Sequence, residues 1–345
     1  MPAPLSPAAA RALLGRAPYF HVAGLDAEGR PLARPLHGAV VGDHLVFHGG
    51  ARGEKLELVG QWVVATASEI VARIPSWFLD PARACPATTL YRSVEVSGVL
   101  APLTDASERA RALDAFTEAL QPERGFQPID LENPLYRGAL DALFIAALPL
   151  AGLKSREKLG AERPAIWRSK VAAGLWQRGL PGDVAALEAL RAAAPDTPLP
   201  PVFAGAPGFS LWGQAPDHLL PAATGLLVDQ YWNVGVSEAT LATAHQRATA
   251  WVAATDGDGA LAATARAITD GSKVAWLFDV AVRADLRGRG LGQALMALLL
   301  DHPAIRGCRR VLLGTRDAHT FYAKLGFAPP LPNGSSVLAR DGSSV

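Results

Sequence analysis

The sequence predicts an α+β protein of two domains, an antiparallel β-barrel extended by helices and then a mixed α/β sheet. Three observations support this fold class. Short strand patterns separated by polar turns fill the first half, the proline-rich stretch 195–208 interrupts the chain, and the second half alternates helices with strands. A chain of 345 residues, 50% of them hydrophobic, can bury a core in each half. We expect domains at 1–194 and 209–345, joined by a linker at 195–208.

Composition narrows the classes of function. The formal net charge is +1 and no block of like charges occurs, which argues against a dedicated nucleic-acid binder. No apolar run reaches the length of a membrane span, and the first residues lack the apolar region of a secretory signal. The two cysteines, Cys85 and Cys308, lack metal-ligand spacing. We therefore expect a cytoplasmic protein with no disulfide framework, no metal and no membrane partner.

The first half begins with a short helix and continues as strands. Ser6 and Pro7 are typical of an N-cap and a first helical residue. The turn residues Asp26, Gly29 and Gly42 then separate runs of alternating or β-branched residues. One amphipathic helix is expected at 106–120. Strands are predicted at 19–25, 31–41, 45–48, 62–68, 93–100 and 143–148, and strands at this spacing favour an antiparallel barrel.

Residues 33–58, ARPLHGAVVGDHLVFHGGARGEKLEL, carry a family resemblance. They resemble the FMN-binding split barrel of the pyridoxamine 5′-phosphate oxidase superfamily, and more closely its nitroimidazole-resistance and negative-regulator branches. The resemblance covers roughly residues 10–160. It implies a homodimer with flavin at the subunit interface, and flavin contacts at Arg34, Pro35, Leu36, His37, Phe47, His48, Gly49, Arg52 and Lys55.

The residues themselves suit a phosphate group. A flavin phosphate is a dianion that needs positive charge and N–H donors, which Lys55, Arg52 and Arg34 and the glycines at 49–50 supply. Glu54 departs from this pattern, because an acid beside a phosphate is unfavourable unless it points away. Haem is the alternative cofactor, with His37 and His48 as its candidate ligands.

The second half begins with helices at 217–230 and 237–248, followed by a hairpin with strands at 250–254 and 261–268. Residues 276–292, WLFDVAVRADLRGRGLG, then predict a strand, a glycine-rich loop and a helix start. Such a loop brings free N–H groups to an anion. The glycine spacing differs from the dinucleotide fingerprint, and glycines alone are equally compatible with a flexible turn. The glycine- and serine-rich tail is expected to be disordered beyond Leu338.

The context of this loop supplies a second resemblance. Arg287-x-x-Gly290-x-Gly292, with FYAKLGF at 321–327, resembles the GNAT superfamily of N-acetyltransferases over roughly residues 210–330. The resemblance implies that pantetheine pairs with a splayed strand at Val280, Ala281 and Val282. It also implies that the acetyl-CoA pyrophosphate lies on the backbone of Arg287, Gly288, Arg289, Gly290, Leu291, Gly292 and Gln293.

Several side chains are candidates for the chemistry. The resemblance implies that Tyr322 is the general acid that protonates the departing thiolate. Asp279, Asp317 and His319 are candidate bases for the acceptor amine, although Asp317 equally suits a cap of the helix that carries Tyr322. Tyr231 and Trp232 are candidates for the acceptor pocket or for core packing.

Three functions therefore remain open. The first is a bifunctional enzyme, a flavin oxidoreductase and an N-acetyltransferase, acting on small nitrogenous molecules. The second is an acetyltransferase whose barrel only binds a ligand or forms the dimer. The third is a ligand-sensing regulator, which the near-neutral charge makes a poor direct DNA binder.

Overall fold

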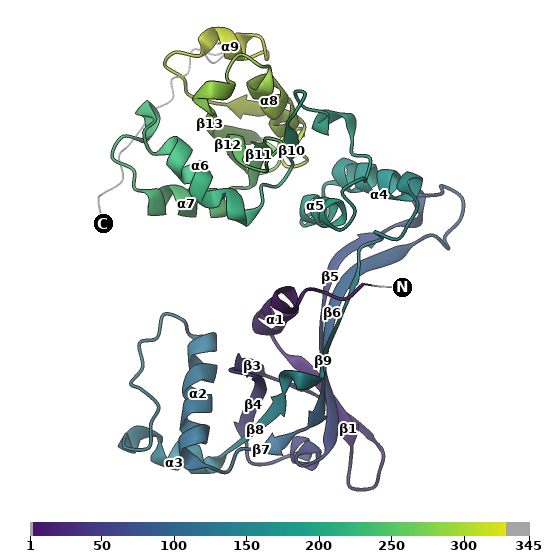
Figure 1. Cartoon of the computed structure of the whole chain (residues 1–345), viewed down its shortest axis with the longest axis vertical. Coiled ribbons are helices and arrows are strands. Elements are labelled where there is room, and N and C mark those ends of the chain that lie inside the picture. Colours follow the sequence, from purple (N-terminus) through teal and green to yellow (C-terminus); the bar gives the residue numbers. More distant parts are fainter. Residues whose placement is uncertain (1–2, 329–345) are drawn as a thin grey trace. The chain divides into compact units, whose positions relative to one another are not determined.

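The computed structural model describes residues 3–328 and divides the chain into two compact units, Met1–Pro164 and Ala165–Val345. Both are drawn in Figure 1. The predicted disorder beyond Leu338 and the last part of the expected second domain fall outside the described residues. The α+β class, with antiparallel sheets first and a mixed sheet second, is confirmed.

The first unit is a split pair of antiparallel sheets, with strand orders β2-β1-β5-β6-β9 and β3-β4-β8-β7. Asp105 caps α2 by accepting a hydrogen bond from the Glu108 N–H, and α2 spans the predicted residues. The elements are α1 (Pro7–Arg16), β1 (Phe20–Leu25), β2 (Pro31–Leu36), β3 (Gly38–Val41), β4 (His44–Gly50), η1 (Glu54–Leu58), β5 (Trp62–Ile74), η2 (Ser76–Phe78), β6 (Thr88–Val99), β7 (Ala101–Pro102), α2 (Ala106–Leu120), α3 (Pro134–Ala142), β8 (Leu143–Pro149), η3 (Leu150–Gly152) and β9 (Leu153–Lys158).

The predicted strand 31–41 is wrong as a single element, because it breaks between β2 and β3 at His37. The two halves enter different sheets, with Leu36 opposite Phe20 and Gly38 opposite Phe47. A run of apolar residues cannot reveal this change of sheet, since both strands show the same local pattern.

The barrel core fills the space between the two sheets. Phe20 and Phe47 are fully buried and meet edge to face at 5.9 Å. On β4 the alternate residue Val46 points away from this core and packs beneath α2, with Ala110 and Leu113. The side chain of Phe47, an expected flavin contact, is therefore part of the barrel core.

As far as residue 328, the second unit contains a five-stranded mixed sheet of order β10-β11-β12-β13-β14, with β13 and β14 parallel. Figure 1 shows α6 and α7 on one side of this sheet and α8 on the other. The elements are α4 (Ala165–Arg178), α5 (Asp183–Ala193), η4 (Pro201–Phe203), β10 (Ser210–Trp212), η5 (Asp217–Leu219), α6 (Leu220–Leu227), η6 (Tyr231–Asn233), α7 (Glu238–Gln246), β11 (Ala250–Thr255), β12 (Leu261–Thr269), β13 (Val274–Val282), η7 (Ala284–Leu286), α8 (Leu291–Asp301), β14 (Arg310–Leu312) and α9 (His319–Ala323).

The boundary between the units differs from the expected one, because α4 and α5 pack within the second unit. Trp176 Nε1 donates to Asp301 at 2.6 Å, and the Gly213 N–H donates to Glu188 at 2.6 Å. The expected linker is also packed here, with Phe203 buried against Trp176 at 4.8 Å. Prolines predict an extended chain but do not reveal whether that chain lies on a surface that buries it.

None of the helices in the described part of the chain combines the length and hydropathy needed to cross a membrane.

Candidate functional site

The glycine-rich loop forms the start of α8. Gly288 and Gly290 have φ values of 77° and 80°, a left-handed conformation that glycine adopts without strain. Gly290 is the N-cap residue and no side chain caps the helix, so its first N–H groups remain available. A Cβ added at either glycine would meet no atom within 4 Å, so the backbone is open to a ligand. The residues present therefore fit a pyrophosphate group.

A cleft of about 990 Å³ extends from this loop along β13. β13 pairs with β14 only from Val274 to Trp276, so beyond Trp276 no strand among the described residues pairs with this edge of β13. The expected pantetheine strand therefore lines the cleft at an edge that no described strand pairs, where the Val282 carbonyl accepts from Arg287 Nε at 3.2 Å. Of the expected acetyl-CoA contacts, those lining the cleft are Val280, Ala281, Val282, Arg287, Gly288, Gly290, Leu291, Gly292 and Gln293, without Arg289.

Asp279 lies at the centre of the cleft wall in an unusual backbone conformation. Its φ is +56°, uncommon for a residue with a side chain. The β12–β13 register shifts here, because Thr264 pairs with Ala281 whereas Arg266 pairs with Phe278. The extra residues of β13 form a bulge that turns the buried Asp279 carboxylate toward the cleft.

Both oxygens of Asp279 are occupied. Arg266 Nε donates to Oδ2 at 2.6 Å, and Trp232 Nε1 donates to Oδ1 at 3.1 Å. Asn233 Nδ2 approaches Oδ1 at 3.4 Å. The Arg266 guanidinium also lies 4.7 Å from the centre of the Phe278 ring. Neither Arg266 nor Asn233 stands out in the sequence, because an arginine in an alanine-rich strand shows no sign of its partner.

Tyr322, Tyr231 and Asp317 come together on the opposite wall. The Tyr231 hydroxyl donates to Asp317 Oδ1 at 3.2 Å and accepts from the Arg316 N–H at 3.0 Å. Tyr231 meets Trp232 edge to face at 4.8 Å, which orders the two expected acceptor residues. Burial raises the pKa of Tyr322 above its usual value, and the neighbouring Tyr231 and Asp317 raise it further. Tyr322 is therefore held in its protonated form.

Two expectations for α9 need correction. Asp317 does not cap this helix, because its N-cap residue is Ala318 and no side chain makes the capping bond. Thr315 Oγ1 instead accepts the Ala318 N–H, and Asp317 accepts the hydroxyl hydrogen of Tyr231. His319 is exposed at the start of α9 and is not part of the cleft lining, so the structure does not bring it to the other candidates.

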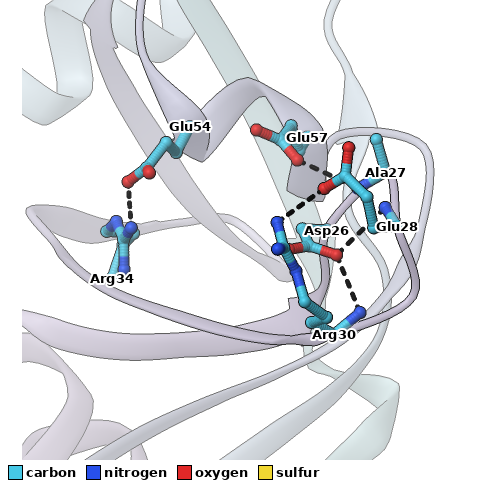
Figure 2. A network of polar contacts seen from close by, with 7 residues as sticks. All are labelled: Asp26, Ala27, Glu28, Arg30, Arg34, Glu54 and Glu57. Atoms are coloured by element: carbon cyan, nitrogen blue, oxygen red, sulfur yellow. Dashed lines mark hydrogen bonds and ion pairs between the residues drawn. The ribbon is translucent and has the colours of Figure 1, made fainter.

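In the first unit, two of the three expected phosphate cations, Arg34 and Lys55, have partners within the protein. Arg34 on β2 forms an ion pair with Glu54 on η1, which Figure 2 shows. Lys55 Nζ donates to the Arg52 carbonyl at 2.6 Å. A Cβ at Gly49 would lie 3.3 Å from Lys55 Cε. Because glycine has no side chain, Lys55 can pack closely against β4 at this position. Lys55 and the glycine backbone fit a phosphate, whereas Glu54 competes for Arg34.

The neighbouring turn holds η1 in place. Asp26 Oδ1 accepts the N–H groups of Glu28 and Arg30 at 3.0 and 2.7 Å, which closes the β1–β2 turn (Figure 2). Glu57 of η1 then accepts the Ala27 N–H of this turn at 3.0 Å. The hairpin therefore fixes the short helix that carries Lys55.

The two candidate haem ligands both pack on α2. The rings of His37 and His48 meet the buried Phe116 edge to face at 5.0 and 4.1 Å. Burial lowers the pKa of His48, and the neighbouring His37 lowers it further. His48 Nδ1 is buried and has no hydrogen-bond partner within the described residues. One face of the histidine pair is thus covered by the protein itself.

Comparisons with known proteins match two separate regions of the chain to two different families. The pyridoxamine 5′-phosphate oxidase family matches residues 6–152, and the acetyltransferase (GNAT) family matches residues 219–327. Glucosamine 6-phosphate N-acetyltransferase 1 of Oryza sativa subsp. japonica is 43% identical over 56 residues, which are 16% of this chain and 34% of that protein. The chain thus spans about a third of the length of this curated relative.

Solved structures resemble each half. A candidate acetyltransferase of the GNAT family from Xanthomonas campestris pv. campestris is 32% identical, covering 40% of this chain and 96% of its own, with a TM-score of 0.36. A candidate 5-nitroimidazole antibiotic resistance protein from Bacteroides thetaiotaomicron is 17% identical, covering 45% of this chain and 86% of its own, with a TM-score of 0.36. The chain is therefore a fusion of two families, a pyridoxamine 5′-phosphate oxidase-like domain followed by an acetyltransferase domain of the GNAT family.

Proposed function

We propose that the second unit is an acetyl-CoA-dependent N-acetyltransferase that acts on a small molecule with a primary amine. The observation that carries the proposal is the single cleft that joins the uncapped start of α8 to Tyr322 and to the wall formed by Tyr231, Trp232 and Asp317. An anion cradle, a protonated phenol and an aromatic wall with a carboxylate are what acetyl transfer to an amine requires.

Acetyl-CoA supplies the activated acetyl thioester. The N–H groups at the start of α8 hold its pyrophosphate, and the unpaired edge of β13 orients its pantetheine arm. When the amine attacks the carbonyl carbon, a C–N bond forms and the C–S bond breaks. Tyr322 then donates its phenolic proton to the departing sulfur.

Asp317 is the better placed of the two carboxylates to accept the proton of the amine. Its Oδ1 accepts from Tyr231, while its Oδ2 makes no hydrogen bond within the described range. Asp279 has no such free oxygen, because Arg266, Trp232 and Asn233 occupy both of its oxygens. We assign Asp279 to holding Trp232 and the bulge in place.

The test is the release of free thiol from acetyl-CoA by the full chain in the presence of a panel of primary amines. Tyr322→Phe is expected to lower kcat by about 100-fold or more and to leave the KM for acetyl-CoA unchanged, since only the proton donor is lost. Tyr136→Phe in the first unit is the matched control. Unchanged turnover in Tyr322→Phe rules out the assigned acid.

For the first unit we propose that Lys55 and the backbone at Gly49 bind the phosphate of FMN. The close packing of Lys55 along Gly49 supports this assignment. Bound FMN would make this unit either an oxidoreductase or a non-catalytic module that dimerises the chain. The absorbance spectrum of the purified chain, with mass spectrometry of the released molecules, distinguishes FMN from haem. Light scattering tests the expected homodimer, and reduction by a nicotinamide cofactor separates a redox enzyme from a module.

A further inference from the structure

The acetyltransferase cleft continues onto two aromatic rings that the proposed chemistry does not use. Trp276 and Phe278 both line the cleft, and both are partly exposed. They are two residues apart on β13 and so share one face of the sheet, where their rings stack with centres 6.2 Å apart. Opposite Trp276 on β12 lies Ile268, which is 51% exposed. This end of the cleft therefore presents an apolar surface to a ligand.

The two rings lie at the end of the cleft away from the proposed CoA site. The pantetheine and pyrophosphate contacts are at 280–293, after the bulge at Asp279, whereas Phe278 and Trp276 come before it. Because a strand advances about 3.3 Å per residue, Phe278 and Trp276 lie about 7 and 13 Å back along β13 from Val280. The acceptor must approach the acetyl group from the side that CoA leaves free, so these rings belong to the acceptor half of the cleft.

Trp232 connects these rings to the assigned acceptor wall. Its indole N–H donates to Asp279 of the bulge, and 40% of its surface is exposed. Its ring meets Tyr231 edge to face at 4.8 Å, and the Tyr231 hydroxyl donates to the carboxylate of Asp317. An aromatic wall therefore extends from the assigned base to Trp276.

The charges beside the rings are already balanced. The Arg266 guanidinium lies 4.7 Å from the centre of the Phe278 ring, but it is bound to the buried Asp279 at 2.6 Å. The other charged residues of the described cleft lining belong to the glycine-rich loop or to the wall near α9, and they are Arg287, Asp317 and Lys324. The rings therefore offer ring stacking and apolar contact rather than a counter-charge.

We propose that the acetyl acceptor is an arylalkylamine, a primary amine joined by a short alkyl chain to an aromatic body that lies against Trp232, Phe278 and Trp276. This inference rests on the proposed acetyl transfer and names its substrate class. The amine nitrogen forms the new C–N bond and gives a proton to Asp317, while the C–S bond breaks and CoA leaves as the free thiol with the proton of Tyr322. A chain of about three carbons brings one ring from the amine to Phe278, and a second ring reaches Trp276.

Three primary amines test the inference by the release of free thiol from acetyl-CoA in the presence of the full chain. They are n-propylamine, 3-phenylpropylamine and 3-(biphenyl-4-yl)propylamine, which share the reacting group and differ in having no ring, one ring or two. We expect kcat/KM to rise about 30-fold with the first ring, because its apolar surface leaves water. The second ring is expected to add about tenfold through its contact with Trp276.

Substitutions at Trp276 assign the gain from the second ring to this surface. Trp276→Ala is expected to reduce that gain about tenfold, so that two rings serve no better than one, whereas Trp276→Phe keeps an aromatic ring and most of the gain. Val234 is 83% exposed, beside the wall but outside the cleft lining, so Val234→Ala is the matched control and retains the gain. Each gain compares two amines in the same variant, so a lower folded fraction cancels.

The outcomes separate the inference from the proposed function. Equal kcat/KM for n-propylamine and 3-phenylpropylamine overturns the inference and leaves the acetyltransferase standing. The same holds if Trp276→Ala keeps the gain from the second ring or if Val234→Ala loses it. No free thiol with any primary amine refutes the proposed function, and the inference falls with it.

Discussion

The ion pair between Asp279 and Arg266 allows a sharp test of whether Asp279 positions the site or acts as a base. Their side chains are 3% and 10% exposed, so the pair is buried. Asp279→Asn keeps the size of the side chain, and asparagine tolerates the φ of +56°. The substitution leaves the Arg266 guanidinium buried without a counter-charge, which costs about 3 kcal/mol in the free energy of local unfolding.

Native-state hydrogen exchange of peptides from β12 and β13 measures this loss, because it reports on the second unit alone. A loss of about 3 kcal/mol corresponds to roughly 100-fold faster exchange. Turnover is expected to fall as well, since asparagine keeps one acceptor oxygen for two donors, Trp232 and Arg266, and so holds Trp232 less firmly. Adding Arg266→Met to Asp279→Asn removes the unpaired cation and is expected to restore part of the protection. Unchanged exchange together with a loss of turnover of about 1000-fold would refute the positioning role and make Asp279 the base.

Three further predictions concern the loop, the barrel and pH. Gly290→Ala forces a side chain into a left-handed conformation at about 1–2 kcal/mol, and it is expected to raise the KM for acetyl-CoA while sparing kcat at saturation. Glu54→Gln frees Arg34 and is expected to strengthen FMN binding about fivefold in titrations at low salt. Because the pKa of His302 falls from its usual 6.5 to about 4, the unfolded chain takes up this proton first. Glu188 of the same unit acts with the opposite sign, because burial raises its pKa to about 7, so the His302 contribution is the difference in urea unfolding between the natural chain and His302→Gln. This difference should be complete above pH 6.5 and fall by about 3 kcal/mol toward pH 4.

Matched controls accompany these variants. Gly225→Ala changes a glycine of α6 with ordinary φ and open space, and it is expected to leave the KM unchanged. Glu28→Gln removes an exposed acid of the neighbouring turn and is expected to leave FMN binding unchanged. An equal gain in both glutamate variants would reduce the Glu54 effect to general electrostatics. A difference between the natural chain and His302→Gln that stays constant from pH 6.5 to pH 4 would exclude the burial of a neutral His302.

The sequence by itself predicted the fold of both domains and the succession of strand, glycine-rich loop and helix start at 276–292. These features leave a local pattern, since glycines at 288 and 290 permit the left-handed turn and the apolar runs of β11 to β13 have the composition typical of buried strands. The resemblance of residues 321–327 to a family motif also singled out Tyr322 as a candidate acid. Each of these features depends on residues that are close together in the sequence, so the sequence alone can predict it.

Only the tertiary structure shows which side chains contact one another. Tyr231 and Asp317 are 86 residues apart, and their hydrogen bond replaces the expected helix cap. Glu54 neutralises Arg34 across two elements, and α4 and α5 pack within the second unit although the prolines come after them. In each case the deciding contact joins residues that are distant in the sequence, which local propensity does not encode.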